Sequence, residues 1–196
     1  MAFIYLSNAL LSIATTQVLD IDYTLFDLSS SAERADELAR PGLHDFLTAA
    51  YASNFDLLIW SATSIKWVDL KMRELGCLSH ADYRIVCMLD AKAMLTVHSH
   101  RYGVYNCKPL AFVWAKFDGA YRPENTVMVD DLRRNYVLNP QNGLVIKPYR
   151  RRAHKQDREL HKIKVCCLGI GGERSYWATG IFGGYFGARV VCHPGP

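Results

Sequence analysis

Short, largely apolar runs that end in polar residues recur along this chain. They span residues 18–21, 55–60, 125–129 and 144–146. Runs of this kind, without regular apolar–polar alternation, are typical of strands buried on both faces, as in parallel sheets. They therefore predict the strands of one central sheet.

Helical spacing appears between these runs. After Pro41 and Gly42, apolar residues recur as on one face of a helix, at Leu43, Phe46, Leu47 and Ala50. We expect further helices over residues 65–75 and 110–117. The first of these can be capped by the hydroxyl of Thr63 or Ser64, and Gly76 can end it. We expect it to bury Trp67, Leu70 and Met72. Alternating strands and helices predict a three-layered α/β fold with a mostly parallel sheet and helices on both faces.

The other segments are less periodic. Residues 83–89 and 93–98 predict two short strands in a small β insertion beside the polar strand ends, and residues 27–40 predict a surface loop with a short helix. We divide the chain into an atypical lead-in over residues 1–17, a main domain over 18–164 and a glycine-rich tail over 165–196. The lead-in favours a strand or helix entering the core over a secretory signal, since no Lys or Arg precedes its apolar centre. We assign the tail no structure.

Two carboxylates and a hydroxyl follow the first run. Asp20, Asp22 and Thr24 are spaced two apart, so a continuing strand would carry them on one side. Unpaired buried charge is expensive, and a bound divalent cation would explain two acids at a strand end. One carboxylate can attack phosphorus, and the other can exchange a proton with the leaving oxygen and with water. The alternative is an acidic turn without a chemical role.

Later strand ends offer partners for these acids. Ser61 follows the second run and either caps a helix or contacts a phosphate. Pro109 favours an extended Lys108, whose ammonium can neutralise a phosphoryl group, although most single lysines are merely exposed. Asp130 and Asp131 follow the third run. Adjacent carboxylates repel unless a cation binds, so with Asp20 they predict a magnesium site, against the alternative of an acidic first helical turn.

Composition sets limits on the function. The chain has 196 residues, is 50% hydrophobic and carries a formal charge of +4, which suits an anionic substrate but indicates neither nucleic-acid nor membrane binding. Its six cysteines include no Cys-x-x-Cys pair, so we expect reduced thiols in a nuclear or cytosolic protein. The basic run over residues 149–152, with Lys155, indicates a nuclear-import signal, a docking patch or a solvated helix start.

The ordered set Asp20-x-Asp22-x-Thr24, Ser61, Lys108 and Asp130-Asp131 resembles the haloacid-dehalogenase superfamily and its FCP/SCP-type protein phosphatases. Residues 19–26, 59–63, 108–110 and 139–144 look like those of the CTD phosphatases that carry a ubiquitin-like domain. The likeness covers residues 18–164 and implies a HAD-like phosphatase domain there. It also implies a magnesium-dependent Ser/Thr phosphatase, monomeric and nuclear or also cytoplasmic. In that family the substrates are proteasome subunits and the phosphorylated tail of RNA polymerase II.

The resemblance also implies roles by position. Asp20 would be the nucleophile and Asp22 the general acid and base, while Thr24, Ser61 and Lys108 would bind phosphate. Asp20, the Asp22 backbone carbonyl and Asp131 would bind Mg²⁺, with Asp130 in support. Neither the lead-in nor the tail matches the family's ubiquitin-like domain and C-terminal helices, so we expect a truncated or alternatively spliced form. Two other hypotheses stay open: an inactive phosphoprotein-binding module, and a small-metabolite phosphatase, which the lack of a large cap insertion disfavours.

Overall fold

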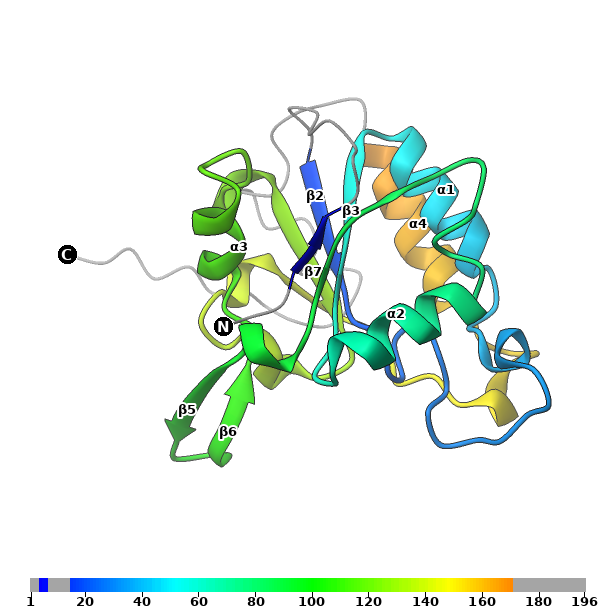
Figure 1. Cartoon of the computed structure of the whole chain (residues 1–196), viewed down its shortest axis with the longest axis horizontal. Helices are drawn as coiled ribbons and strands as arrows, with labels where there is room; N and C mark the ends of the chain where they lie inside the picture. The colour runs from blue at the N-terminus through cyan, green and yellow to red at the C-terminus, as the bar shows by residue number, and fades with distance from the viewer. Residues whose placement is uncertain (1–3, 7–14, 171–196) are drawn as a thin grey trace.

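The main sheet of this protein has six strands with a single antiparallel edge. The computed structural model describes residues 4–6 and 15–170, with side chains for residues 15–164. The order across the sheet is β1 (Ile4–Leu6), β4 (Ile85–Leu89), β3 (Phe55–Trp60), β2 (Thr15–Leu19), β7 (Thr126–Asp130) and β8 (Gly143–Val145) (Figure 1). β1 pairs antiparallel with β4, and every other neighbouring pair in this sheet is parallel.

Helices cover both faces of this sheet, as predicted (Figure 1). Successive residues of a strand point to opposite faces. Leu57 and Ile59 of β3 therefore belong to the core beneath α1 (Leu43–Ala52), α2 (Ile65–Glu74) and α4 (Glu159–Ile170). Leu58 and Trp60 belong to the core beneath α3 (Leu110–Lys116) on the other face. The prediction of a three-layered, mostly parallel α/β fold is confirmed.

The first strand of the main domain differs from the prediction at both ends. β2 begins at Thr15 and contains Gln17, which is buried and does not interrupt the strand. It ends at Leu19 instead of residue 21. The chain then turns sharply, because the amides of residues 24–26 all donate to the carbonyl of Ile21, at 2.8–3.1 Å. Tyr23 takes a left-handed backbone conformation there, with φ of 63°.

The second long helix begins as predicted and buries Met72 as predicted, while Trp67 is half-buried. Ser64 caps α2 by accepting from the Trp67 amide. The helix buries Val68, Lys71 and Met72, whereas Leu70 is 44% exposed. The burial of Leu70 was therefore a wrong prediction. Lys71 can face the core because its ammonium lies 4.6 Å from the centroid of the Phe26 ring while its aliphatic stem packs on the core.

The small β insertion exists, but with other bounds. Residues 83–89 were predicted as its first strand, but their ordered part, Ile85–Leu89, is β4 of the main sheet. The insertion consists of β5 (Leu95–Ser99) and β6 (Gly103–Cys107), an antiparallel hairpin at the lower left of Figure 1. A continuous apolar run does not reveal which sheet it joins, which explains the error.

The predicted surface loop over residues 27–40 is only partly exposed. It contains the short 3-10 helix η1 (Ala35–Leu38), but Asp27 and Arg40 at its two ends are buried. Helix α4 continues past Lys164 to Ile170, into the segment predicted to be a tail. Residues 1–3, 7–14 and 171–196 lie outside the described part of the chain, so the lead-in and tail boundaries stay predictions.

Membrane-spanning helices and disulfides were two further subjects of the sequence analysis. Within them, no helix has the length and apolarity needed to cross a bilayer. Of the cysteines whose side chains the structure describes, Cys77, Cys87 and Cys107 are buried and form no disulfide.

Candidate active site

The polar strand ends predicted from the sequence meet at one edge of the sheet. β2 lies between β3 and β7, and the chain passes from β2 to β3 on one side and later returns to β7 on the other. Open α/β sheets bind ligands outside the carboxyl ends of their strands at such a switch point. Here those ends carry Asp20, Ser61 and the Asp130–Asp131 pair, at the lower edge of the sheet in Figure 1.

Lys108 lies at the centre of this edge. Its Nζ donates to Asp20 Oδ1 at 2.5 Å and to Asp130 Oδ2 at 2.7 Å, and the residue is 1% exposed. The Lys108 amide donates to the Asn135 carbonyl at 2.6 Å, which fixes the backbone between β6 and α3. The predicted convergence of Asp20, Lys108 and the second acidic strand end is present.

Asp130 is fully engaged by the protein. Besides Lys108, both of its oxygens accept from Asn135 Nδ2 at 2.8 Å, and Oδ1 accepts from the Leu132 amide at 2.8 Å. Sequence reasoning missed Asn135. It lies in a polar stretch after β7, where its position five residues from an acidic strand end was the only available signal.

Three carboxylates could hold a metal ion together. Ligand oxygens of Asp20, Asp130 and Asp131 all lie within 4.8 Å of one another. Hard carboxylate oxygens are the donors that Mg²⁺ prefers, so the residues present fit that ion. Asp130 accepts four hydrogen bonds and Asp20 accepts two, which favours Asp20 and Asp131 as direct ligands, and this choice stays a prediction. The Asp22 carboxylate is not in this set, and its carbonyl as a ligand stays a prediction.

Asp22 lies beside Ser61 and outside the group of three carboxylates. Ser61 Oγ donates to Asp22 Oδ2 at 3.3 Å, and it is 2.9 Å from Thr63 Oγ1. Asp22 Oδ1 is buried without a hydrogen-bond partner among the described residues. Thr24 Oγ1 donates to Asp20 Oδ2 at 3.0 Å, so in this structure it orients a carboxylate; its phosphate contact stays a prediction.

Burial shifts the protonation of these acids. It raises the pKa of Asp20 to about 7 against the opposing charge of Lys108, with repulsion from Asp130 adding to the rise. It also raises the pKa of Asp22, and that of Asp131 to about 6. For Lys108, attraction from Asp130 and Asp20 outweighs burial and raises the pKa, so the ammonium stays charged. An Asp22 that holds its proton more tightly is suited to act as a general acid.

A buried ion pair outside the predicted set positions the loop after β2. Arg40 Nη1 donates to the Thr24 carbonyl at 2.9 Å. Its Nε and Nη2 donate to the two oxygens of Asp157, at 2.9 and 2.8 Å, and Nη2 also donates to the Lys147 carbonyl at 2.8 Å. The Tyr149 amide donates to the Tyr23 carbonyl at 2.6 Å. Residues 147–157 thus hold the turn that carries Asp20, Asp22 and Thr24.

Comparison with known proteins agrees with this geometry. The family model described as NLI interacting factor-like phosphatase matches residues 15–173. The ubiquitin-like domain-containing CTD phosphatase of Arabidopsis thaliana is 55% identical over 148 residues, which cover 76% of this chain and 43% of that protein. The ubiquitin-like domain-containing CTD phosphatase 1 of Danio rerio is 53% identical over 149 residues, covering 74% of this chain and 46% of the relative.

The human protein of the same name as the Danio rerio relative is 49% identical over 148 residues, covering 76% of this chain and 46% of its own length. The chain thus spans less than half the length of these relatives, and the match lies in the region that carries the acidic strand ends. The resemblance drawn from the motifs is confirmed, and the chain belongs to the NLI interacting factor-like phosphatase family.

Proposed function

We propose that this chain hydrolyses phosphate monoesters on serine and threonine side chains of proteins, with magnesium held by Asp20 and Asp131. One observation carries the proposal: the carboxylates of Asp20, Asp130 and Asp131 converge, with the Lys108 ammonium 2.5 Å from Asp20. Acids and a buried lysine gathered at a strand edge suit the transfer of a phosphoryl group, in which charge neutralisation and positioning dominate.

The proposed reaction has two steps at the phosphorus atom. In the first, an Asp20 oxygen attacks phosphorus while Asp22 gives its proton to the ester oxygen. The ester P–O bond breaks, the substrate hydroxyl leaves and an aspartyl phosphate remains on Asp20. In the second, the Asp22 carboxylate takes a proton from water, whose oxygen attacks phosphorus. The bond to Asp20 breaks, inorganic phosphate leaves and Asp22 is protonated again.

The neighbouring residues support these steps. Lys108 offsets the negative charge of Asp20 and of the incoming phosphate, and Thr24 orients the attacking carboxylate through its 3.0 Å hydrogen bond. Ser61 holds Asp22 beside the ester oxygen and can donate to a phosphate oxygen. When bound, magnesium supplies further positive charge against the repulsion between carboxylates and phosphate.

The substrate is inferred from the family. The relatives are named CTD phosphatases, and we extend a protein substrate of that kind to this chain. The described insertion is a two-stranded hairpin, too small to close over a metabolite, which supports an open site for a polypeptide. A proteasome subunit or the RNA polymerase II tail, met in the nucleus, remains the substrate that the sequence resemblance implies.

The test uses the purified chain with an aryl phosphate and a phosphoserine peptide, with Mg²⁺ and with a chelator. We expect metal-dependent turnover of both, and Asp20→Asn should lower kcat at least about 10³-fold because it removes the nucleophile. Asp45→Asn, on the exposed side of α1, is the matched control and should keep its rate. Wild-type turnover by Asp20→Asn would refute the assignment. Peptide binding without turnover would support an inactive binding module, and turnover of the aryl phosphate alone would support a metabolite enzyme.

A further inference from the structure

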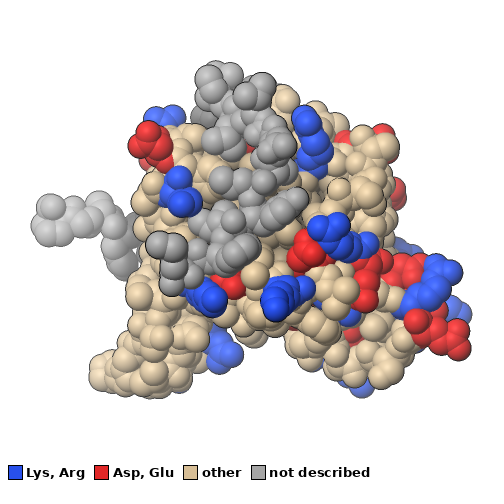
Figure 2. Space-filling model, in the orientation of Figure 1, with Lys and Arg blue, Asp and Glu red and all other residues tan. Residues whose placement is uncertain are grey.

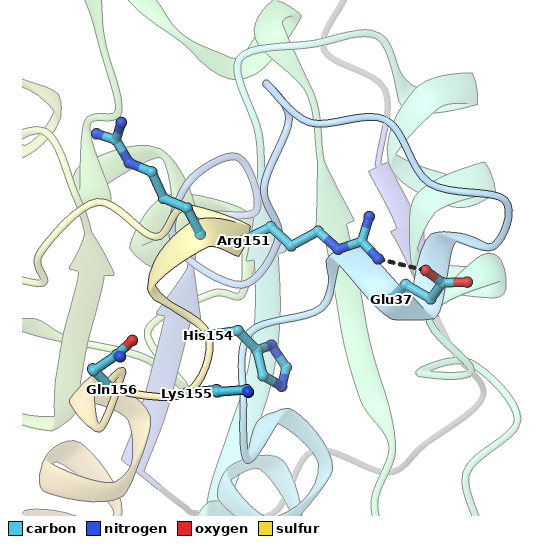
Figure 3. Close-up of a pocket in the computed structure, with 6 residues that line it drawn as sticks. Glu37, Arg151, His154, Lys155 and Gln156 are labelled. Atoms are coloured by element: carbon cyan, nitrogen blue, oxygen red, sulfur yellow. Dashed lines mark hydrogen bonds and ion pairs between the residues drawn. The ribbon is translucent and has the colours of Figure 1, made fainter.

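A basic cavity, open to solvent, lies on the segment that follows Tyr149, whose amide donates to the carbonyl of Tyr23. It has a volume of about 470 Å³ and is lined by Glu37, Arg151, Arg152, His154, Lys155 and Gln156. Figure 3 shows Arg151 reaching from one wall toward Glu37 on the other, with His154 and Lys155 below them. The volume lies within the range of sites that bind small ligands or single side chains.

One wall of this cavity is fixed to Asp27, just after the turn that carries Asp20, Asp22 and Thr24. The Arg151 amide donates to Asp27 Oδ2 at 2.8 Å, and Asp27 is fully buried. Asp27 also accepts from Ser29 and Ser30 hydroxyls at 2.6 Å, and these hydrogen bonds, which outweigh its burial, lower its pKa. It therefore holds the chain as a carboxylate at neutral pH. Loop 27–40 and the segment around Arg151 lie together at the lower right of Figure 1.

Two cations of the cavity are uncommitted. Arg151 Nη2 donates to Glu37 Oε2 at 2.6 Å, so this pair neutralises itself. Arg152 and Lys155 are exposed and have no side-chain partner among the described residues. The cavity thus presents two free positive charges. An anion that enters it gains their attraction without breaking an existing ion pair.

Arg150 extends this positive charge toward the active site. Its guanidinium carbon lies 3.7 Å from the centroid of the Tyr23 ring, next to Asp22 in the chain. Its Nη1 lies 4.0 Å from Asp27 Oδ1 and has no hydrogen-bond partner among the described residues. Arg150 therefore extends the positive charge from the cavity to the turn that carries Tyr23.

We propose that this cavity binds an anionic side chain, acidic or phosphorylated, on the same polypeptide whose phosphorylated residue occupies the active site. The proposal rests on the proposed function for that second residue. A nucleic acid suits the surface less well, because acidic and basic side chains alternate over the lower right of the molecule in Figure 2. Asp36 and Glu37 lie in η1 on this side. Each is paired with an arginine, Arg34 or Arg151, so this side of the described surface offers no continuous positive stripe for a phosphate backbone but leaves room for one anionic group.

The test compares peptides that carry one phosphoserine and one variable residue. The variable residue is one of three: Glu, Gln, or a phosphonate analogue of phosphoserine that resists hydrolysis. In successive peptides it is placed one position further from the phosphoserine, on the N-terminal or the C-terminal side. At the spacing that fills the cavity, we expect kcat/KM to exceed that of the Gln peptide about three- to tenfold, as exposed ion pairs allow. The preference should decline as salt rises, because these charges are exposed.

Matched variants assign the preference to the cavity. The double substitution Arg152→Gln with Lys155→Gln should bring the ratio between anionic and Gln peptides close to one, and neither side chain supports the fold through a described contact. Lys116→Gln, an exposed lysine on α3, should keep the ratio. A preference of the Glu peptide alone, or of the phosphonate alone, would identify which anion the cavity selects.

Three results would overturn the proposal. The first is equal use of all peptides by the wild-type chain at every spacing. The second is a preference that survives the double substitution or disappears in Lys116→Gln. The third is oligonucleotide binding that the double substitution abolishes, without any peptide preference. If no phosphate ester is turned over at all, the proposed function fails separately; the cavity is then tested by peptide affinity, with the same ratios expected for Kd.

Discussion

The pair between Arg40 and Asp157 offers a sharp test of how the catalytic turn is held. Both side chains are nearly inaccessible, at 0% and 8% exposed, and they meet through two hydrogen bonds of 2.8 and 2.9 Å. Asp157→Asn preserves the volume but removes the charge that compensates the guanidinium. Leaving one partner of a buried pair uncompensated costs about 3–5 kcal/mol.

The loss is measured as the urea midpoint of unfolding, with an unchanged denaturant slope as the sign that stability alone has changed. The matched control is Asp69→Asn, which removes an exposed pair with Arg73 on α2, 2.8 Å long. Such pairs contribute about 0.3–0.5 kcal/mol. The double variant Arg40→Met with Asp157→Leu should recover only part of the loss. It leaves no buried charge, but the carbonyls of Thr24 and Lys147 lose their Arg40 donor.

The pair should also matter for turnover, because Arg40 donates to the Thr24 carbonyl while Thr24 orients Asp20. The partly restored double variant, assayed where it is folded, should therefore still have a lower kcat than the wild type. An Asp157→Asn midpoint no lower than that of Asp69→Asn would show that the pair does not support the turn, and the positioning argument would fail.

Three further predictions concern the site and its supporting strand. Lys108→Met leaves the carboxylates of Asp20 and Asp130 unneutralised and should lower the free energy of unfolding by about 3–5 kcal/mol at neutral pH. The loss should be smaller at acid pH, where a protonated acid relieves the repulsion; urea midpoints at both pH values check this, and equal losses would contradict it. The pKa of Asp20 in the folded chain, about 7, lies above its ordinary value of 3.8. Protonation of Asp20 therefore stabilises the metal-free fold, and this contribution is full at low pH and is lost as the pH rises through 7. Mg²⁺ needs the deprotonated acid, so the rise in Tm on adding Mg²⁺ should be larger at about pH 8 than at about pH 5.5, and an equal rise would disprove the linkage. Gly143→Ala should cost at least about 1–3 kcal/mol, because the added Cβ collides with the ring of Tyr136; an unchanged Tm would contradict this.

The strand ends could be predicted because burial and chemistry leave a strong local signal there. Phe55–Trp60 is buried at every position, and its apolar run coincides with the strand. Asp20 and Asp130 each follow or end such a run, and parallel strands bring their carboxyl ends to one edge. The local signal was therefore sufficient for the residues that carry the proposed chemistry.

Other features depend on partners far away in the chain. Arg40 looks like one more polar loop residue until Asp157, 117 positions later, meets it in the core. Asp56 interrupts an apolar strand and is tolerated because the Tyr121 hydroxyl donates to it at 2.9 Å. Asn135 supports Asp130 only because the chain folds back after β7. Periodicity carries no information about such contacts.

The most direct test of the central claim is to find the phosphoryl group on the protein. The chain is mixed with a phosphoserine peptide and Mg²⁺, quenched in acid during turnover and treated with borohydride, which reduces an aspartyl phosphate to homoserine. Peptide mass spectrometry then locates the modified residue. The account predicts homoserine at position 20, absent without substrate and absent in Asp20→Asn. Steady turnover with no modification at position 20, or with modification of another residue, would contradict it.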